Sequence, residues 1–373
     1  MNAANDEYLM PGGGASITAL PKVSLHDHLD GGLRPQTVIE LASEIGHELP
    51  ETDAASLGSW FAEKSDSGSL VEYLKTFDIT TAVMQTHAGL VRVAREFVED
   101  LAADGVIYGE VRWAPEQHLT RGLSLDETVE AVQQGIEEGI DLAAGNGHTI
   151  RIGQLVSAMR HADRGLEIAH LAVRHHTRGV VGFDIAGAEA GFPASNLRDA
   201  FDYLAQNYLP TTVHAGEADG IHSIRSALFD GRALRLGHGV RIAEDVIVAD
   251  EDDENTYVTL GPVAQWVKDR EIALELSPSS NLQTGAIAQW GDEIEDHPFD
   301  LLYQLGFRVT VNTDNRLMSS TSLSRELSIL AEAFGYDLTD LAVFQLNAAA
   351  SSFLPLDDRE ELADRITAGF EHA

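Results

Sequence analysis

Short apolar runs rich in Val, Ile and Leu alternate eight times with amphipathic segments along this 373-residue chain, and this alternation limits the possible folds most strongly. The runs cover residues 22–28, 106–115, 149–159, 179–187, 209–217, 233–240, 272–281 and 308–314. Segments between them, such as 124–144 and 162–177, place apolar residues at helical spacing. Eight strands alternating with helices predict an α/β fold, a parallel (β/α)₈ TIM barrel, which often forms one large domain.

Two segments depart from the simple alternation. Residues 50–103 are too long for one crossover, so we expect a helical lid inserted after the first strand, and residues 322–372 predict added carboxy-terminal helices. The stretch 249–257, "ADEDDENTY", is interpreted as an acidic surface loop. Since no low-complexity linker divides the chain, residues 1–373 are expected to form a single domain.

The charge balance excludes several classes of partner. Sixty Asp and Glu against 25 Lys and Arg give a net charge of -35, which argues against binding to nucleic acid or anionic membranes. The chain has no cysteine, so disulfides, thiolate nucleophiles and cysteine zinc sites are excluded. The first twenty residues lack the pattern of a secretory signal, and no apolar run reaches membrane-spanning length, so we expect a soluble, cytoplasmic protein.

Unusual polar residues fall at the trailing ends of the apolar runs. They are His26, His28, Asp184, His214, Glu217, His238 and Asp314. In a barrel all these ends open onto one face, the face that carries the active site. The pattern therefore predicts a site assembled from several strands.

Three imidazoles and one carboxylate form a ligand set suited to Zn²⁺. They belong to His26, His28, His214 and Asp314. Catalytic zinc lowers the pKa of its water to about 7. Binuclear hydrolases on this barrel bridge their metals with a modified Lys at the end of the fourth strand, and the run 179–187 has no Lys. We therefore expect one zinc per chain. His161, His175 and His176 lack this placement and are interpreted as structural.

Glu217 and His238 are candidates for proton chemistry. Glu217 follows His214 by three residues, close enough to project beside the metal, where burial would let it hold a proton and donate it to a ring nitrogen. His238 lies between two glycines, which leaves its ring free to orient or deprotonate the zinc water. The alternatives are a structural carboxylate that binds loop amides and a hydrogen-bonded rim histidine.

At this point the sequence resembles the adenosine deaminase family of the amidohydrolase superfamily, over residues 20–350 or so. The matching motifs are "PKVSLHDHLDGGLRP", "VVGFDIAGAE", "TVHAGE", "LGHG", "LSPSSNLQTGA" and "VNTDN". The resemblance implies a (β/α)₈ barrel with one Zn²⁺ that converts adenosine, and by extension 2′-deoxyadenosine, to inosine and ammonia in purine salvage. A small-molecule purine nucleoside is thus the expected partner.

The resemblance also implies a role for each matching residue. His26, His28, His214 and Asp314 would bind zinc, Glu217 would protonate purine N1, and His238 would act on the zinc water, which Asp314 aims. The backbone of Gly187 would meet N3, and Asp30 the ribose 5′-hydroxyl. By position, the lid would supply apolar cover from Leu70, Tyr73, Leu74 and Phe77, for which plain helix core is the alternative.

The chain departs from the family pattern at two positions. Many members carry a second acid after the "NTD" aspartate, where this chain has Asn315. Purine N7 only accepts hydrogen bonds, and the Asn315 amide can donate one without first being protonated. Many members also carry Glu where this chain has Ser24, and we have no functional account of that change.

Several alternative functions stay open at this stage. Within the family they are deamination of free adenine, of AMP, or of another 6-substituted purine nucleoside. From a different class, the chain would be a zinc-binding protein on the same scaffold without turnover, which the complete set of metal, acid and base residues disfavours.

Overall fold

The structure is a computed structural model that describes residues 7–251 and 256–373. Each of the eight apolar runs contains a strand, as predicted. The strands are β1 (Lys22–His28), β2 (Val106–Trp113), β3 (Arg151–Met159), β4 (Val180–Ala186), β5 (Thr212–Ala215), β6 (Arg235–His238), β9 (Ala273–Leu276) and β10 (Val309–Val311).

These eight strands form a closed barrel. They pair in parallel in two groups of four, in the orders β1-β2-β3-β4 and β10-β9-β6-β5. Backbone bonds join the two groups at both seams: His28 N donates to Asp314 O at 2.8 Å, and Phe183 N donates to Pro210 O at 3.1 Å. The (β/α)₈ prediction is confirmed, and the seam at Asp314 lies within the group of residues that the sequence singled out.

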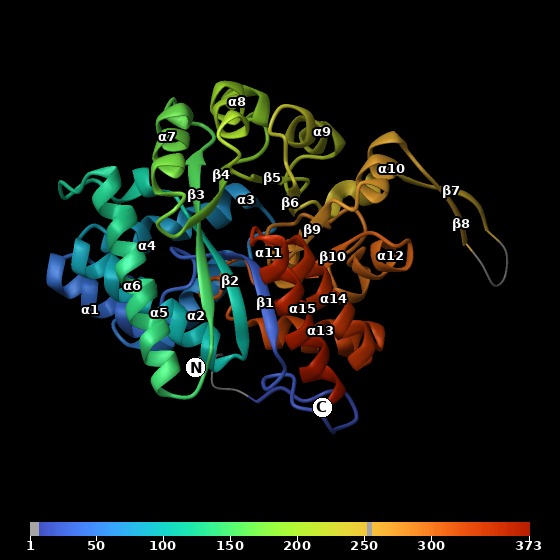
Figure 1. Cartoon of the computed structure of the whole chain (residues 1–373), viewed down its shortest axis with the longest axis horizontal. Helices are drawn as coiled ribbons and strands as arrows, with labels where there is room; N and C mark the ends of the chain where they lie inside the picture. The colour runs from blue at the N-terminus through green and yellow to red at the C-terminus, as the bar shows by residue number, and fades with distance from the viewer. Residues whose placement is uncertain (1–6, 252–255) are drawn as a thin grey trace.

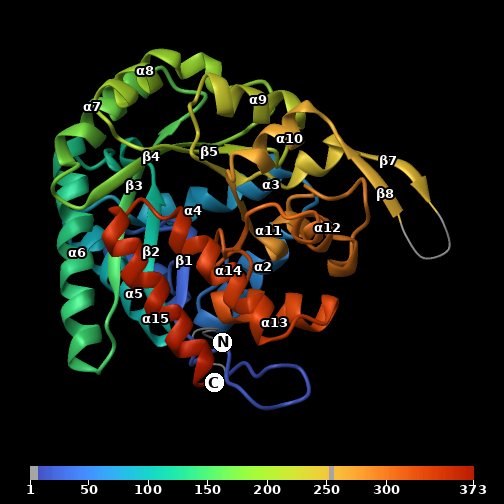
Figure 2. The same ribbon diagram turned by 45° about the vertical axis from the view of Figure 1, so that its right-hand side comes forward.

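Helices surround the barrel as an outer layer (Figures 1 and 2). They are α5 (His87–Ala103), α6 (Leu125–Gly145), α7 (Gly165–His175), α8 (Arg198–Gln206), α9 (Ile221–Phe229), α10 (Pro262–Asp269) and α12 (Phe299–Gln304). Two glycines four residues apart let α5 approach α6 closely: a Cβ at Gly135 would lie 2.3 Å from Val91 O, and one at Gly139 would lie 2.6 Å from Val98 Cβ. Short 3₁₀ helices complete the connections: η3 (Pro115–His118), η4 (Ala194–Leu197), η5 (Val240–Asp245) and η6 (Ile294–Asp296).

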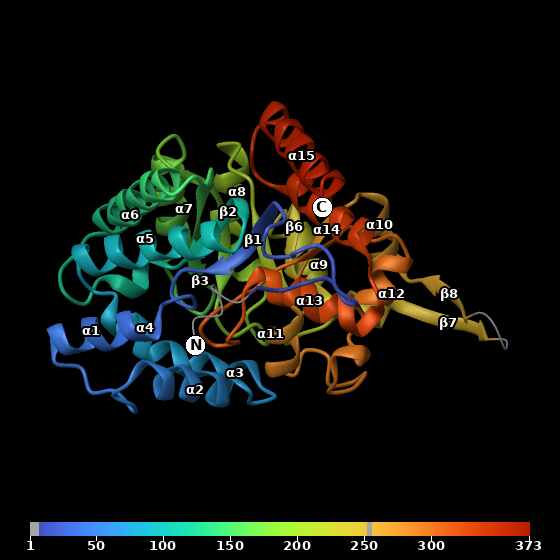
Figure 3. The same ribbon diagram turned by 90° about the horizontal axis from the view of Figure 1, so that it is seen from below.

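The long segment between β1 and β2 is helical, and only part of it lies over the end of the barrel. It contains α1 (Pro35–Ile45), α2 (Ala54–Ser65), α3 (Leu70–Tyr73), η2 (Leu74–Thr76), α4 (Phe77–Val83) and then α5. Ser67 N and Gly68 N both donate to Gln283 O, so the α2–α3 turn contacts α11 (Pro278–Gln283) at one edge of the molecule (Figure 3). Because α5 packs along α6 instead, residues 54–83 are the part placed to cover the barrel mouth, and their action as a lid stays a prediction.

The carboxy-terminal residues form the added helices that the sequence predicts. They are α13 (Leu323–Phe334), α14 (Leu338–Ser351) and α15 (Leu356–Glu371). Gln345 of α14 accepts a hydrogen bond from Val23 N at 2.8 Å, and Leu362 and Ile366 of α15 pack in one apolar cluster with Val23 and Leu25 of β1. None of the helices in the described part of the chain combines the length and apolar character that a membrane crossing requires.

The acidic stretch 249–257 was the one wrong secondary-structure prediction. An antiparallel hairpin of β7 (Val246–Glu251) and β8 (Thr256–Leu260) projects from the barrel here (Figure 1), and residues 252–255 lie outside the described residues. Runs of β-branched residues on either side of the acids, such as Val246–Ile247–Val248, favour strands. The two strands extend into the acidic stretch, which its charge alone had indicated to be a loop.

Candidate metal centre and pocket

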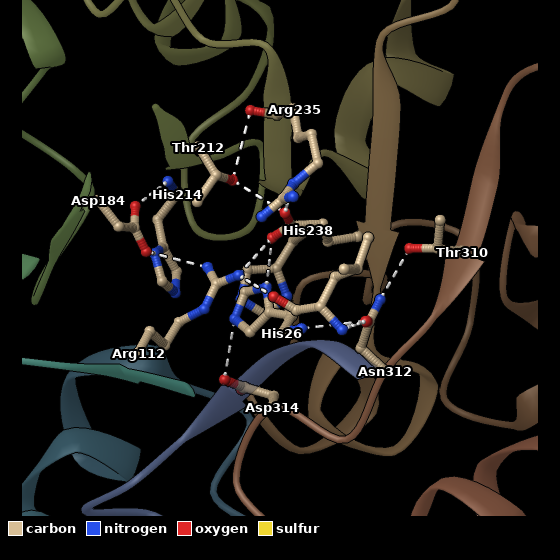
Figure 4. Close-up of polar contacts among 12 residues, drawn as sticks. His26, Arg112, Asp184, Thr212, His214, Arg235, His238, Thr310, Asn312 and Asp314 are labelled. Atoms are coloured by element: carbon tan, nitrogen blue, oxygen red, sulfur yellow. Dashed lines mark hydrogen bonds and ion pairs between the residues drawn. The ribbon is translucent and has the colours of Figure 1, made fainter. Parts of the chain in front are cut away.

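The carboxyl ends of β1, β5, β6 and β10 bring together all five residues that the sequence proposes for metal binding and for action on its water. Figure 4 shows four of them, His26, His214, His238 and Asp314. Ligand atoms of His26, His214, His238 and Asp314 lie within 4.8 Å of one another. His28 Nε2 lies 3.3 Å from both His214 Nε2 and Asp314 Oδ1. All five side chains are buried, so whatever they bind is held away from bulk water.

Carboxylates fix the orientation of two of these histidines. His26 Nδ1 lies 3.1 Å from Glu275 Oε2, and His214 Nδ1 lies 2.7 Å from Asp184 Oδ2. A carboxylate only accepts hydrogen bonds, so each ring carries its proton on Nδ1 and presents the lone pair of Nε2 to the cluster. Metal-binding histidines in proteins are held in this way.

The cluster fits a cation. The lone pair of His26 Nε2 faces Asp314 Oδ1 at 3.2 Å, and within the described residues that nitrogen has no hydrogen-bond partner. Burial and Arg112 lower the pKa of His26, but Asp314 and Glu275 outweigh them and raise it above its ordinary value. Acceptors that face one another at this distance need a proton or a metal ion between them. Imidazole nitrogen with carboxylate oxygen is a donor set that suits a divalent transition metal.

Beneath the cluster, a buried ion network holds the two supporting carboxylates. Arg112 donates to Asp184 Oδ2 at 2.9 Å and to Glu275 Oε2 at 2.7 Å, and Arg235 donates to Glu275 Oε1 at 2.6 Å and to Glu110 Oε2 at 2.5 Å. All five side chains lie inside the barrel. Although burial raises the pKa of Glu275, the two arginines hold it well below the usual range, so this carboxylate stays ionised.

Glu217 lies in the loop after β5 and is suited to carry a proton. Burial raises its pKa well above the usual range, and the charges of Asp314 and Glu189 raise it further. The loop amides are bound by a different residue: Glu189 accepts from the N–H groups of residues 216–219 at 2.6 to 3.0 Å. Glu217 itself points to the cluster, with Oε2 3.5 Å from His238 Nε2.

A cavity of about 490 Å³ opens above the cluster. All the residues expected to contact a substrate line it, together with two of the proposed metal ligands, His28 and His214. The expected residues are Asp30, Leu70, Tyr73, Leu74, Phe77, Gly187, Glu217, His238, Asp314 and Asn315. His26 lies beneath this lining and is fully buried. Trp113, Ser157, Met159 and His161 also line the cavity and were not proposed from the sequence. They lie at or just after the ends of β2 and β3. The interpretation of His161 as a structural residue away from the site is therefore wrong in its placement, because the residue follows the end of β3 and lines the cavity.

Three of the residues that line the cavity, Asp30, Asn315 and Gly187, carry polar groups there. Asp30 is buried, which raises its pKa to about 7, and its Oδ1 has no hydrogen-bond partner in the described part of the chain. Asn315 fits against Gly31, where a Cβ would lie only 1.9 Å from Asn315 Oδ1. Gly187 has φ of 98°, a backbone conformation that favours glycine and leaves its peptide group at the cavity.

Comparison with known proteins finds relatives that match most of the chain. A family model described as adenosine deaminase matches residues 21–369. Adenosine deaminase 1 of Streptomyces coelicolor is 58% identical over 344 residues, which cover 92% of this chain and 85% of that protein. Among solved structures, adenine deaminase from Arthrobacter aurescens is 25% identical with a TM-score of 0.79, covering 94% of this chain and 99% of that one. The Arabidopsis N6-mAMP deaminase is 28% identical with a TM-score of 0.78 and the same coverage.

Proposed function

The chain belongs to the adenosine deaminase family and deaminates adenosine by hydrolysis, and we propose that it does so with one zinc ion held by His26, His28, His214 and Asp314. The observation that carries this proposal is the meeting of these four side chains at the floor of a cavity whose wall holds a buried Glu217, with a pKa raised well above the usual range. The products are inosine and ammonia.

Zinc bound there would supply a Lewis acid that lowers the pKa of a water molecule to about 7 and so provides a nucleophile at neutral pH. The protein's part is to aim that nucleophile. Asp314 Oδ2 accepts a hydrogen bond from Ser280 Oγ at 2.6 Å, which fixes the carboxylate while Oδ1 faces the histidines. His238 lies next to Glu217, with Nε2 3.5 Å from Glu217 Oε2.

Glu217 supplies the general acid. Burial raises its pKa well above the usual range, which favours the protonated carboxyl, and donation of that proton to purine N1 makes C6 electron-poor and open to attack. The proton stays available because Glu189, and not Glu217, satisfies the amides of the surrounding loop.

The remaining polar groups position the nucleoside. We assign Gly187 N–H to purine N3, the Asn315 amide to N7 and Asp30 to the ribose 5′-hydroxyl. Each of these residues lines the cavity. An amide at position 315 donates to N7 directly, whereas an acid would have to be protonated first.

The helices from 54 to 83 act as a lid over this nucleoside, in a single domain with the barrel. Leu70, Tyr73, Leu74 and Phe77 line the cavity from this segment, and they exclude bulk water from the reacting centre. The hydrogen bonds from Ser67 and Gly68 to Gln283 connect the segment to α11, the short helix that carries Ser280 and Asn281.

A substrate panel tests the proposal. We expect adenosine and 2′-deoxyadenosine to be deaminated far faster than adenine or AMP when each is offered separately and the loss of the 6-amino group is followed by absorbance. Relatives of similar fold act on a free base and on a nucleotide, as their names state, so the panel addresses a real alternative. Adenine or AMP turned over as fast as adenosine would contradict the proposed sugar contact.

A further inference from the structure

A chain of buried hydrogen bonds behind His238 determines which of its ring nitrogens carries the proton. The chain begins at a backbone amide: Phe299 N donates to His297 Nδ1 at 3.0 Å. His297 Nε2 lies 3.1 Å from Asn281 Oδ1, and Asn281 Nδ2 lies 3.0 Å from His238 Nδ1. His297, Asn281 and His238 are each at most 2% exposed, so water does not compete for these bonds.

The direction of every bond in this chain follows from its first member. A backbone N–H can only donate, so His297 Nδ1 must be bare, and the proton of this neutral ring is on Nε2. That N–H needs an acceptor, which must be the Asn281 oxygen. The amide nitrogen of Asn281 therefore faces His238 Nδ1 and donates to it. The opposite orientation of the Asn281 amide is excluded, because its NH₂ group would then face the N–H of His297 Nε2 and two donors would be in contact.

We propose that Asn281 and His297 are positioning residues that keep the proton of His238 on Nε2, so that His238 presents an N–H donor to the reaction site rather than a lone pair. Nε2 is the nitrogen that faces Glu217 Oε2, at 3.5 Å. The chemical consequence rests on the proposed function: His238 donates a hydrogen bond to the oxygen that attacks C6, and it is not the base that takes the proton from that oxygen.

The same reasoning separates His238 from the other clustered histidines. Distance alone would admit His238 as a metal ligand, since its ring lies within the same 4.8 Å group as His26 and His214. The supporting groups differ, however. In His26 and His214 a carboxylate contacts Nδ1, so Nε2 is unprotonated and faces the cluster. In His238 an amide N–H group contacts Nδ1 instead. A nitrogen that carries a proton cannot bind a metal.

Burial lowers the pKa of His297 to about 3, so this ring is neutral. The ring of His238 accepts the Asn281 amide hydrogen at Nδ1, which leaves Nε2 as the position for its proton. The backbone at His238 has φ of 60° and is followed by Gly239 at 70°, so both residues adopt the left-handed conformation.

Nitrogen-15 NMR of histidine-labelled, metal-free protein at neutral pH tests the tautomer directly, with His238→Gln assigning the resonances. We expect His238 Nδ1 to show the 15N chemical shift of an unprotonated imidazole nitrogen and Nε2 to show that of a protonated one. The reverse pattern would overturn the proposal. Since metal and turnover are not involved, this result is separate from the substrate panel, which tests the proposed function.

Asn281→Asp provides the matched perturbation. A carboxylate of nearly the same shape accepts from both histidines, so we expect the His238 proton to move to Nδ1 in the metal-free spectrum. In zinc-loaded protein, kcat for adenosine should fall about a hundredfold, the effect of losing one preorganised donor, with KM changed much less. Asn207→Asp, the same change at an exposed helix end, should alter neither property.

An unchanged His238 tautomer in Asn281→Asp would show that Asn281 does not determine it. A rise in KM with kcat preserved would show that the residue merely supports the fold. If the variant does not fold, the wild-type spectrum still decides, because it reports the tautomer itself.

Discussion

Replacing Asp30 by Asn should change the choice between nucleoside and nucleotide. Asp30 Oδ1 is buried at the cavity wall without a hydrogen-bond partner among the described residues. A hydroxyl group of the substrate would supply the missing hydrogen-bond donor. At about pH 8.5, where the assay is run, a carboxyl group with a pKa of about 7 is ionised. A hydrogen bond from the 5′-hydroxyl to that charged carboxylate is worth about 1.5 to 3 kcal/mol. At about 1.4 kcal/mol per tenfold, its loss lowers kcat/KM for adenosine by about 10- to 100-fold.

The same carboxylate should repel a 5′-phosphate. Two like charges about 4 Å apart cost about 4 kcal/mol at an effective dielectric of about 20, which corresponds to a factor of about a thousand. The two effects together predict a preference for adenosine over AMP of about four orders of magnitude in the wild type. In Asp30→Asn this ratio should shrink by at least about a hundredfold, because adenosine loses its anchor and AMP loses the repulsion.

The assay is kcat/KM for adenosine and AMP, measured on both proteins by absorbance. Asp78→Asn is the control, because Asp78 lines the same cavity from α4 but is exposed, so its charge is screened and its removal should leave the ratio within about threefold. If Asp30 only caps the turn at Gly31 and Gly32, the ratio will not move in Asp30→Asn. That result, or AMP rivalling adenosine in the wild type, would refute the assignment.

Three further substitutions test other parts of the site and fold. Glu217→Gln should keep its metal and lose at least about a hundredfold in kcat, since an amide cannot transfer the proton; near-normal rates in metal-replete protein would make Glu217 structural. Glu275→Gln should weaken metal affinity about 10- to 100-fold by calorimetric titration, and unchanged affinity would exclude its orienting role. Lys22→Met removes bonds to three carbonyl oxygens and should lower the free energy of unfolding by about 2 kcal/mol or more in urea titration. The exposed Lys75→Met should change it by under about 0.5 kcal/mol, and equal effects would contradict the argument.

The barrel could be predicted from the sequence because its signal is local and repeated. Each apolar run is bounded by turn residues and followed by a helical period, so an error in one strand would not have changed the fold. The β7–β8 hairpin could not be predicted, because the same few residues carry two opposing signals. Val246 and Tyr257 favour strands, whereas the acids between them favour an exposed loop, and the interpretation followed the acids.

The residues that point into the site were predictable for a similar reason, since strand ends and chemical type together single out His26, His214 and Asp314. The groups behind them were not. Glu275 and His26 are 249 residues apart, and their contact depends on which strands adjoin inside the barrel, which periodicity does not give. Asn281 and His297 are ordinary polar residues in sequence, and only their geometry shows that they orient His238.

We propose that one metal ion per chain, held by three histidines and Asp314, makes the deaminase active. Metal-depleted protein titrated with Zn²⁺ tests it most directly, with bound metal and adenosine turnover followed in the same samples. We expect activity to be absent at the start, to rise in proportion to bound zinc and to saturate at one equivalent per chain. Saturation at two equivalents, or full activity after exhaustive chelation, would contradict the account.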